Sequence, residues 1–130
     1  SQFNLNNLQD RKYHLLFHKL LENTQIKMSA LQSKLLINAI LYWTSPYQPG
    51  HGHDEYLNFY MAQKPAYLPA YQPMQSVSEL RLVRGVSSNL YRAMLPNLIV
   101  LPELTPININ TAPSVILKSL GNGLNDAQVD

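Results

Sequence analysis

The sequence predicts a mainly α-helical domain of the α+β class, with short strands at its ends. Apolar residues recur at helical spacing in two stretches, residues 10–23 and 29–43. Apolar and polar residues alternate near both ends, at residues 3–6 and 107–110, as a half-buried strand requires. Between these regions, residues 44–75 lose all periodicity. We therefore expect helices around a long irregular segment, closed by short strands.

Composition narrows the class of protein. The chain has 130 residues, of which 45% are hydrophobic, so it can bury a core and is not disordered. A net charge of +2 is too small to indicate a nucleic-acid or membrane surface. There is no cysteine, which excludes disulfides, thiolate ligands and a cysteine nucleophile. Only 14% of residues are charged, and such a surface suits contact with another protein.

The two long helices have different apolar patterns. The first, over residues 10–23, carries one apolar stripe, made of Tyr13, Leu16, Phe17, Leu20 and Leu21. The second, over residues 29–43, is apolar around most of its circumference, which predicts a buried helix. Ser45-Pro46 ends it, because the residue before a proline disfavours the helical conformation.

The segment 44–75 holds five of the nine prolines and five of the eight tyrosines. It is too aromatic for a flexible linker, so we expect an ordered long loop with a helical turn near residues 56–61. Ser76 and Glu79 then have capping-box spacing and start a short helix closed by Gly85. Ser87 or Ser88 starts another, which ends before Pro96.

The C-terminal part is predicted from residue 98 onward. Residues 98–101 are interpreted as an apolar connector, and residues 107–113 join a strand to a helix start at Thr111 and Pro113. Gly121 ends that helix, and Asn125 caps a further one that the chain truncates. Because the chain also starts without methionine, we expect a fragment of a longer protein.

Ligand-type side chains gather in one place only, the sequence His51-Gly52-His53-Asp54-Glu55. His51, His53 and Asp54 would begin a zinc site, although nothing elsewhere clearly completes the tetrahedron. Asp54 and Glu55, with loop carbonyls, would begin a calcium site, which needs six to eight oxygens. The third interpretation is a solvated polar loop, and it is the one that the sequence favours.

Other polar residues are explained more simply by structure than by chemistry. His14 and His18 are four residues apart, but the glutamate of a metalloprotease helix is missing between them, so we expect a solvated pair. Glu79 is expected to cap its helix, and Trp43 to lie in the core. The sequence has no G-x-S-x-G, no phosphate-binding loop and no paired acids, so we predict no enzyme and no catalytic residue.

Residues 107–125 resemble a helix-hairpin-helix module, in which hairpin backbone N–H groups bind a DNA phosphate beside basic residues. Here Lys118 is the only cation between Glu103 and the end of the chain. Phosphate binding depends on such cations, so a DNA-binding module is the second choice, and we expect no nucleic-acid partner.

The whole chain resembles the minor pseudopilin K family of bacterial type II secretion systems. The similarity begins at residues 3–8, which match the family's F-N-L-N-N-L segment, and it runs in order along the chain. The later matching blocks are Ala39-Ile40-Leu41-Tyr42-Trp43, Gly52 with Asp54, Glu55 and Tyr56, Pro73-Met74, Ser78 to Val83 with Gly85, Leu101-Pro102, and Asn108 to Ala112.

The resemblance implies a helical domain inserted in a pilin-like scaffold. Residues 1–8 would be an edge strand of the pilin-like part, residues 9–106 the inserted domain with its Pro- and Tyr-rich loop 44–75, and residues 107–130 a truncated strand and helix-hairpin-helix-like segment. It also implies a non-catalytic assembly subunit at the pseudopilus tip, with minor pseudopilins I and J as partners. An N-terminal membrane helix outside this chain would anchor it to the inner membrane, facing the periplasm.

The family associates this region with calcium, and the chain departs from the family there. The family's D-W-I-D stretch is Tyr42-Trp43-Thr44-Ser45 here, and its A-N dipeptide is Ala70-Tyr71. Asp54 and Glu55 remain as the calcium candidates, and no other cofactor is indicated. We therefore expect tyrosine packing to do part of the ordering that calcium does in the family.

Overall fold

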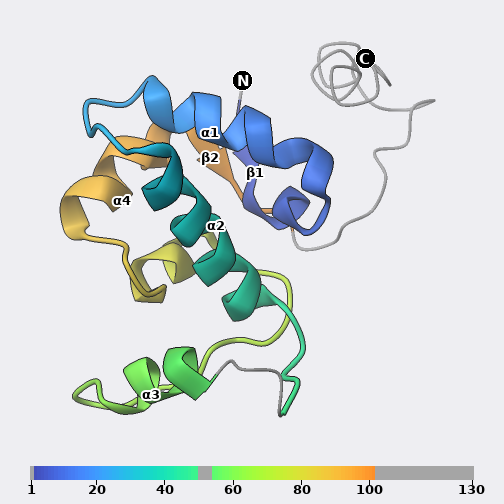
Figure 1. Cartoon of the computed structure of the whole chain (residues 1–130), viewed down its shortest axis with the longest axis vertical. Coiled ribbons are helices and arrows are strands. Elements are labelled where there is room, and N and C mark those ends of the chain that lie inside the picture. Colours follow the sequence, from blue (N-terminus) through green and yellow to red (C-terminus); the bar gives the residue numbers. More distant parts are fainter. Residues whose placement is uncertain (1, 50–53, 102–130) are drawn as a thin grey trace.

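The computed structural model describes residues 2–49 and 54–101 (Figure 1). The α-helices and strands, in chain order, are β1 (Phe3–Asn4), α1 (His14–Glu22), α2 (Ala30–Thr44), α3 (Asp54–Met61), α4 (Ser88–Met94) and β2 (Leu98–Ile99). Short 3-10 helices lie at Leu5–Gln9, Arg11–Tyr13, Val77–Leu82 and Leu95–Asn97. The described part is therefore mainly helical with short strands, as the sequence predicts.

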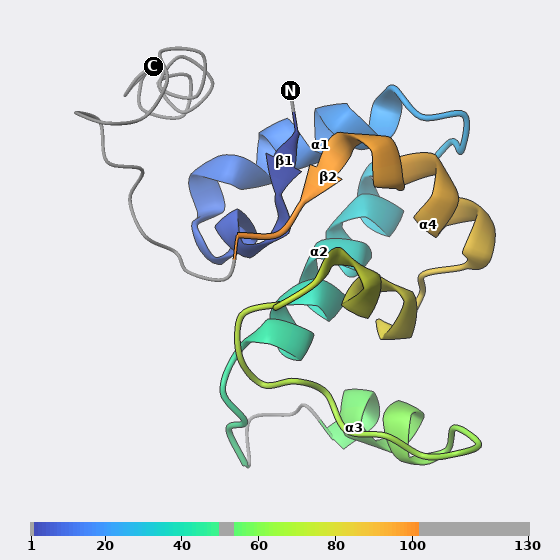
Figure 2. The same cartoon turned by 180° about the vertical axis from the view of Figure 1, so that it is seen from behind.

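Helix α2 runs through the middle of the molecule and separates two ends. Figures 1 and 2 show α1 and the two strands at one end of α2, with α4 alongside, and α3 at the other end. The chain therefore leaves the main body after α2, forms α3, and returns before the Val77–Leu82 helix. The segment 44–75 is this excursion.

The two strands are far apart in sequence and lie side by side. β1 pairs with β2 in parallel, with Phe3 opposite Leu98 and Asn4 opposite Ile99. The prediction of a strand over residues 3–6 is too long, because the Asn4 side chain accepts a hydrogen bond from Asn6 N at 3.1 Å and caps a 3-10 helix there. The prediction that residues 98–101 form only a connector is wrong at Leu98 and Ile99, which form β2. They are a strand because they pair with residues 95 positions earlier in the sequence.

The first predicted helix exists but is divided and only partly buried. A 3-10 turn precedes α1, and the Asp10 side chain accepts from Lys12 N at 3.1 Å to cap it. Phe17 and Leu21 are buried as the stripe predicts. Leu16 is 46% exposed, so its assignment to the stripe is wrong. The core covers a narrower face of α1 than the spacing implies.

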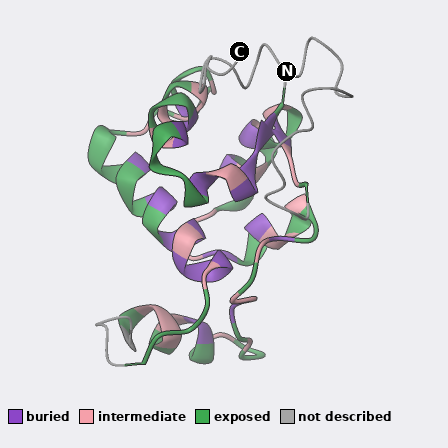
Figure 3. Ribbon diagram, turned by 90° about the vertical axis from the view of Figure 1, so that its right-hand side faces the viewer, coloured by how far each residue is buried: buried purple, intermediate pink, exposed green. Residues whose placement is uncertain are grey.

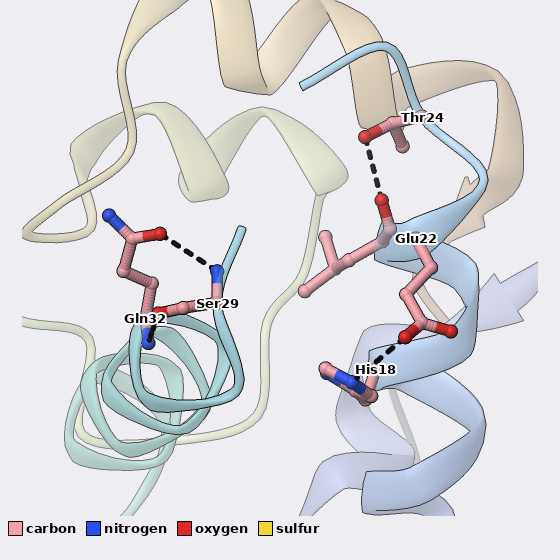
Figure 4. Close-up of polar contacts among 6 residues, drawn as sticks. His18, Glu22, Thr24, Ser29 and Gln32 are labelled. Atoms are coloured by element: carbon pink, nitrogen blue, oxygen red, sulfur yellow. Dashed lines mark hydrogen bonds and ion pairs between the residues drawn. The ribbon is translucent and has the colours of Figure 1, made fainter. Parts of the chain in front are cut away.

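Helix α2 begins and ends as predicted, within one residue. Ser29 is its N-cap, with Gln32 N donating to Ser29 Oγ at 3.1 Å and Ser29 N donating to Gln32 Oε1 at 2.9 Å (Figure 4). Its all-round burial is not observed, because Leu31 and Leu35 are 64% and 53% exposed. Figure 3 shows both exposed and buried turns along the helix. The last turns of α2 are nearly enclosed, since Ala39, Ile40, Tyr42, Trp43 and Thr44 are all buried, whereas the earlier turns bury one side only.

The turn between α1 and α2 is held by local contacts. Thr24 Oγ1 donates to the carbonyl of Leu21 at 2.8 Å, which satisfies a group at the end of α1 (Figure 4). The same hydroxyl lies 3.0 Å from the carbonyl of Ile26. The same view shows His18 Nε2 3.3 Å from the carboxylate of Glu22, one turn along α1.

The caps before α4 follow the sequence closely. Ser76 and Glu79 form the predicted capping box, although the helix it starts is a 3-10 helix. Ser87 Oγ accepts from Leu90 N at 3.1 Å and caps α4, which ends two residues before Pro96. Gly85 has φ +89° in the turn between them, a conformation that glycine adopts without strain.

One hydrophobic core joins the helices and strands. Its most enclosed members include Leu5, Leu8, Phe17, Leu21, Ile40, Tyr60, Met74, Leu80 and Met94. Within the described ranges, no helix has both the length and the apolar content that crossing a membrane requires. The predictions for residues 102–130, including the helix-hairpin-helix-like segment, lie outside the described residues.

Candidate functional site

The aromatic residues of the loop and of the end of α2 form one group, here called the tyrosine cluster. Its members are Tyr42, Trp43, Tyr47, Tyr56, Phe59, Tyr60, Tyr67 and Tyr71. Tyr42 stacks on Tyr56 at 4.9 Å between ring centroids and meets Tyr71 edge-on at 5.6 Å. Such geometries are the favourable ones for aromatic pairs. The described residues of the loop predicted over 44–75 therefore pack through aromatic side chains against one another and against the end of α2.

Hydrogen bonds fix the cluster to the neighbouring chain. The Tyr42 and Tyr71 hydroxyls are 2.9 Å apart, and Tyr71 N donates to Trp43 O at 2.8 Å. Tyr67 OH donates to Leu82 O at 2.8 Å. The Tyr60 hydroxyl accepts from Arg84 N at 2.9 Å. These bonds tie α3 and the returning segment to α2 and to the segment around residues 82–84.

Burial changes the acidity of three of these phenols. It raises the pKa of Tyr60 to about 12, although the hydrogen bond from Arg84 N acts in the opposite direction. Burial also raises the pKa of Tyr42, and the hydrogen bond to Tyr71 adds to the rise. The pKa of Tyr67 is raised by burial as well. All three phenols are therefore held neutral, as packing and hydrogen-bonding groups.

The two calcium candidates are in different situations. Glu55 lies in α3 with its side chain 77% exposed, and its Oε2 is 3.0 Å from the Arg84 guanidinium. Arg84 also lies over the rings of Tyr56 at 5.5 Å and Phe59 at 5.4 Å. Asp54 is the first residue of α3, but the structure does not describe its side chain. His51 and His53 lie outside the described residues. The structure thus brings Glu55 together with a cation of the chain itself.

The remaining candidates have structural partners. Glu79 Oε1 accepts from Trp43 Nε1 at 3.0 Å, and Glu79 Oε2 accepts from Gln75 N at 2.7 Å and from Ser76 N at 3.3 Å. Glu79 is therefore a capping residue that also satisfies the indole of Trp43, which is buried in the core as predicted.

The histidines of α1 do not act together. His14 Nε2 is 2.8 Å from Leu8 O, and His18 pairs with Glu22. Residues 2–49 and 54–101 contain no group of three or more His, Cys, Asp or Glu side chains placed to hold a metal ion.

Sequence reasoning missed a buried asparagine contact, here called the asparagine latch. Asn6 Nδ2 donates to Leu101 O at 2.7 Å and to Met74 O at 3.1 Å, while Asn6 Oδ1 accepts from Met74 N at 2.8 Å. Asn4 Oδ1 accepts from Leu101 N at 3.1 Å. The latch joins the N-terminus to two distant segments. The available signal was the F-N-L-N-N-L segment, in which asparagines alternate with apolar residues; two of its three asparagines, Asn4 and Asn6, are buried.

Comparison with known proteins identifies the family. The sequence model described as "Type II secretion system (T2SS), protein K" matches residues 1–103. The chain belongs to the type II secretion system protein K family. Within that family it is 39% identical over 100 residues to protein K of Klebsiella pneumoniae, covering 74% of this chain and 29% of that protein. Protein K of Pseudomonas aeruginosa is 41% identical over 63 residues, which cover 48% of this chain and 19% of that protein.

The fold agrees with a solved protein K complex. A chain in the crystal structure of the GspK-GspI-GspJ complex from enterotoxigenic Escherichia coli has a TM-score of 0.60 and 25% sequence identity. The similarity covers 98% of this chain and 47% of that one. The present chain therefore spans less than a third of the two protein K sequences named above, and about half of the solved chain.

Proposed function

We propose that this chain is the helical domain of a minor pseudopilin, a structural assembly subunit at the tip of the type II secretion pseudopilus. The observation that carries the proposal is its membership of the protein K family, whose sequence model matches residues 1–103 and so includes every described residue. In this role the protein supports export of folded proteins across the outer membrane. It acts through contacts with neighbouring subunits.

The proposed partners are minor pseudopilins I and J. Support comes from the crystal structure in which GspK is found with GspI and GspJ, because a chain of that complex shares the present fold. A low charged fraction is also compatible with a surface that lies against other subunits.

The proposed domain arrangement is an insertion in a pilin-like scaffold. Residues 1–8 would belong to the edge of that scaffold, residues 9–106 would be inserted, and residues 107–130 would continue the chain. The pairing of Phe3–Asn4 with Leu98–Ile99 supports an insertion, because the four α-helices of the described residues lie between two strands that meet, although β2 itself falls within the range 9–106. An inserted domain needs such adjacent entry and exit points.

A non-catalytic role is proposed from how the acidic side chains are used. Glu79 accepts three hydrogen bonds in a capping box, Glu55 pairs with Arg84, and Glu22 pairs with His18. A general acid or base needs a geometry facing a substrate, whereas these carboxylates face the chain's own donors.

We also propose a periplasmic position, with the full-length protein anchored in the inner membrane by a helix that precedes this chain.

Co-purification tests the proposal. Full-length protein K would be co-expressed with minor pseudopilins I and J from the same bacterium, with an affinity tag on J. We expect protein K to elute with I and J as one complex at micromolar concentration. An unrelated periplasmic protein of similar size, expressed with the same two subunits, is the control for adventitious capture. Failure of protein K to elute above that control contradicts the proposal.

A DNA-binding assay distinguishes the proposed assembly role from the alternative, a helix-hairpin-helix DNA-binding module. The chain should show no binding to duplex DNA above that of a non-binding control at physiological salt. A complex whose affinity falls steeply with added salt would instead support the helix-hairpin-helix interpretation.

A further inference from the structure

The end of the molecule that carries α3 contains a cation of its own. We propose that α3 and the returning segment 62–73, together called the α3 lobe, are ordered by Arg84 and the tyrosine cluster and do not require a bound divalent ion. This inference concerns the stability of the domain and does not depend on the proposed partners. It departs from the calcium that the family resemblance implies.

The described donor set does not fit calcium. A calcium ion takes six to eight oxygen ligands, with carboxylates prominent among them. In this part of the described chain, Glu55 is already paired with Arg84, and both oxygens of Glu79 accept hydrogen bonds. Thr44 Oγ1 donates to Ile40 O at 2.9 Å and accepts from Gln9 Nε2 at 2.7 Å. Among the described side chains near α3 and the end of α2, the oxygens of Glu55, Glu79 and Thr44 are therefore engaged by donors of the chain.

Two tyrosines stand where the family resemblance has polar ligand-type residues. Tyr42 occupies the first acidic position of the D-W-I-D stretch, and Tyr71 occupies the asparagine of the A-N dipeptide. Their hydroxyls are 2.9 Å apart and their rings meet edge-on. These two side chains connect the end of α2 to the returning segment directly, and the hydrogen bond from Tyr71 N to Trp43 O runs beside them.

Arg84 supplies positive charge to α3 from a distant segment. Its guanidinium contacts Glu55 at 3.0 Å and lies over the rings of Tyr56 and Phe59, residues that are neighbours on one side of the helix. Its backbone N–H donates to Tyr60 OH. Because Glu55 is exposed, the ion pair alone is a weak tie. Its effect here is to neutralise the carboxylate, while the rings and the Tyr60 bond fix the position of Arg84.

Thermal unfolding with calcium chloride and with EDTA tests the proposal on the unmodified 130-residue chain. A ligand at a hundredfold excess over its dissociation constant stabilises a domain of this size by about 5 °C or more. We expect the melting temperature to differ by less than about 1 °C between the two conditions, with magnesium chloride as the control for ionic strength. A calcium-dependent rise of about 5 °C or more would overturn the proposal, whichever residues bound the ion.

Hydrogen exchange on variants tests the part assigned to Arg84. Arg84→Gln should speed exchange of the Tyr67 and Tyr71 amides by about tenfold or more, because the lobe opens more often. Arg84→Lys keeps the charge but not the planar group, so its effect should be smaller. Arg81→Gln is the matched control, since Arg81 lies over Tyr91 on α4. Equal exchange in the Arg84→Gln and Arg81→Gln chains would contradict the role of Arg84.

Discussion

The middle and the C-terminal end of α2 have different surroundings. In the middle, Leu36, Ile37 and Ile40 belong to a largely aliphatic core shared with α1, α4 and the strands, and we call this part the body. At its C-terminal end, Tyr42 and Trp43 enter the tyrosine cluster of the α3 lobe. Figure 3 shows most of the buried ribbon in the body and little of it near α3.

The difference lies in the kind of contact that each part uses. Aliphatic burial is non-directional and grows with the area removed from water, so the body tolerates small shifts but not lost volume. Aromatic hydroxyls need particular partners at particular distances, so the lobe is sensitive to the loss of single polar atoms. Changes of volume and changes of polarity should therefore affect the two parts differently.

The largest expected effect is the loss of a body side chain. Phe17 is fully buried, and its ring packs against that of Phe3 with 5.3 Å between the ring centroids. Phe17→Ala should lower the free energy of unfolding by about 4 kcal/mol, through lost burial and the cavity that remains. The neighbouring Leu16→Ala is the matched control and should cost less than about 0.5 kcal/mol, because Leu16 is largely exposed. Urea unfolding measures both, and similar losses would contradict the assignment of the core.

The asparagine latch should give the next largest effect. It is the exception in the body, because it is directional and joins three segments. Asn6→Ala should cost about 3 kcal/mol, since the buried backbone N–H and carbonyl of Met74 and the partly buried carbonyl of Leu101 lose their partner. Asn7→Ala is the control at less than about 1 kcal/mol, because Asn7 is only half-buried and accepts one long hydrogen bond from Asn4. A loss no greater for Asn6→Ala than for Asn7→Ala would show that the latch is not stabilising.

The sequence predicts local features of this fold better than contacts between distant segments. The caps at Ser29, Ser76 and Ser87 were predictable because each depends on residues within three positions. The strand at Leu98–Ile99 was not, because its hydrogen-bonding partner lies near the other end of the sequence. The same is true of Arg84, whose contact with Glu55 spans the returning loop. Periodicity also could not say which side of α2 faces the core.

A smaller effect is expected from one hydroxyl of the lobe. Tyr60→Phe keeps the ring but removes the acceptor of Arg84 N, so it should cost about 1 kcal/mol. Tyr47→Phe is the control and should be nearly neutral, because Tyr47 is 45% exposed and its hydroxyl has no hydrogen-bond partner among the described residues. Chemical unfolding followed by Trp43 fluorescence would measure both. If neither change matters, the lobe depends on ring burial alone.

The effect of pH on stability should be the smallest near neutrality, where the buried phenol of Tyr60 is protonated. Burial raises the pKa of Tyr60 from its ordinary 10.0 to about 12. The folded chain thus holds this proton more tightly than the unfolded chain does. Its stabilising contribution is complete below pH 10 and is lost as the pH rises toward 12. Near-ultraviolet circular dichroism should show the lobe loosening in that interval, and aromatic signals that stay constant through it would contradict the burial of Tyr60.

Native-state hydrogen exchange on the unmodified chain and on Tyr42→Phe tests the difference between the two parts most directly. The Tyr71 amide reports on the lobe and the Met74 amide on the latch, each through a 2.8 Å hydrogen bond. We predict that Tyr42→Phe speeds exchange at Tyr71 by about tenfold, corresponding to about 1.4 kcal/mol, and leaves Met74 unchanged. Equal acceleration at both amides would show that lobe and body open as one unit, contrary to this account.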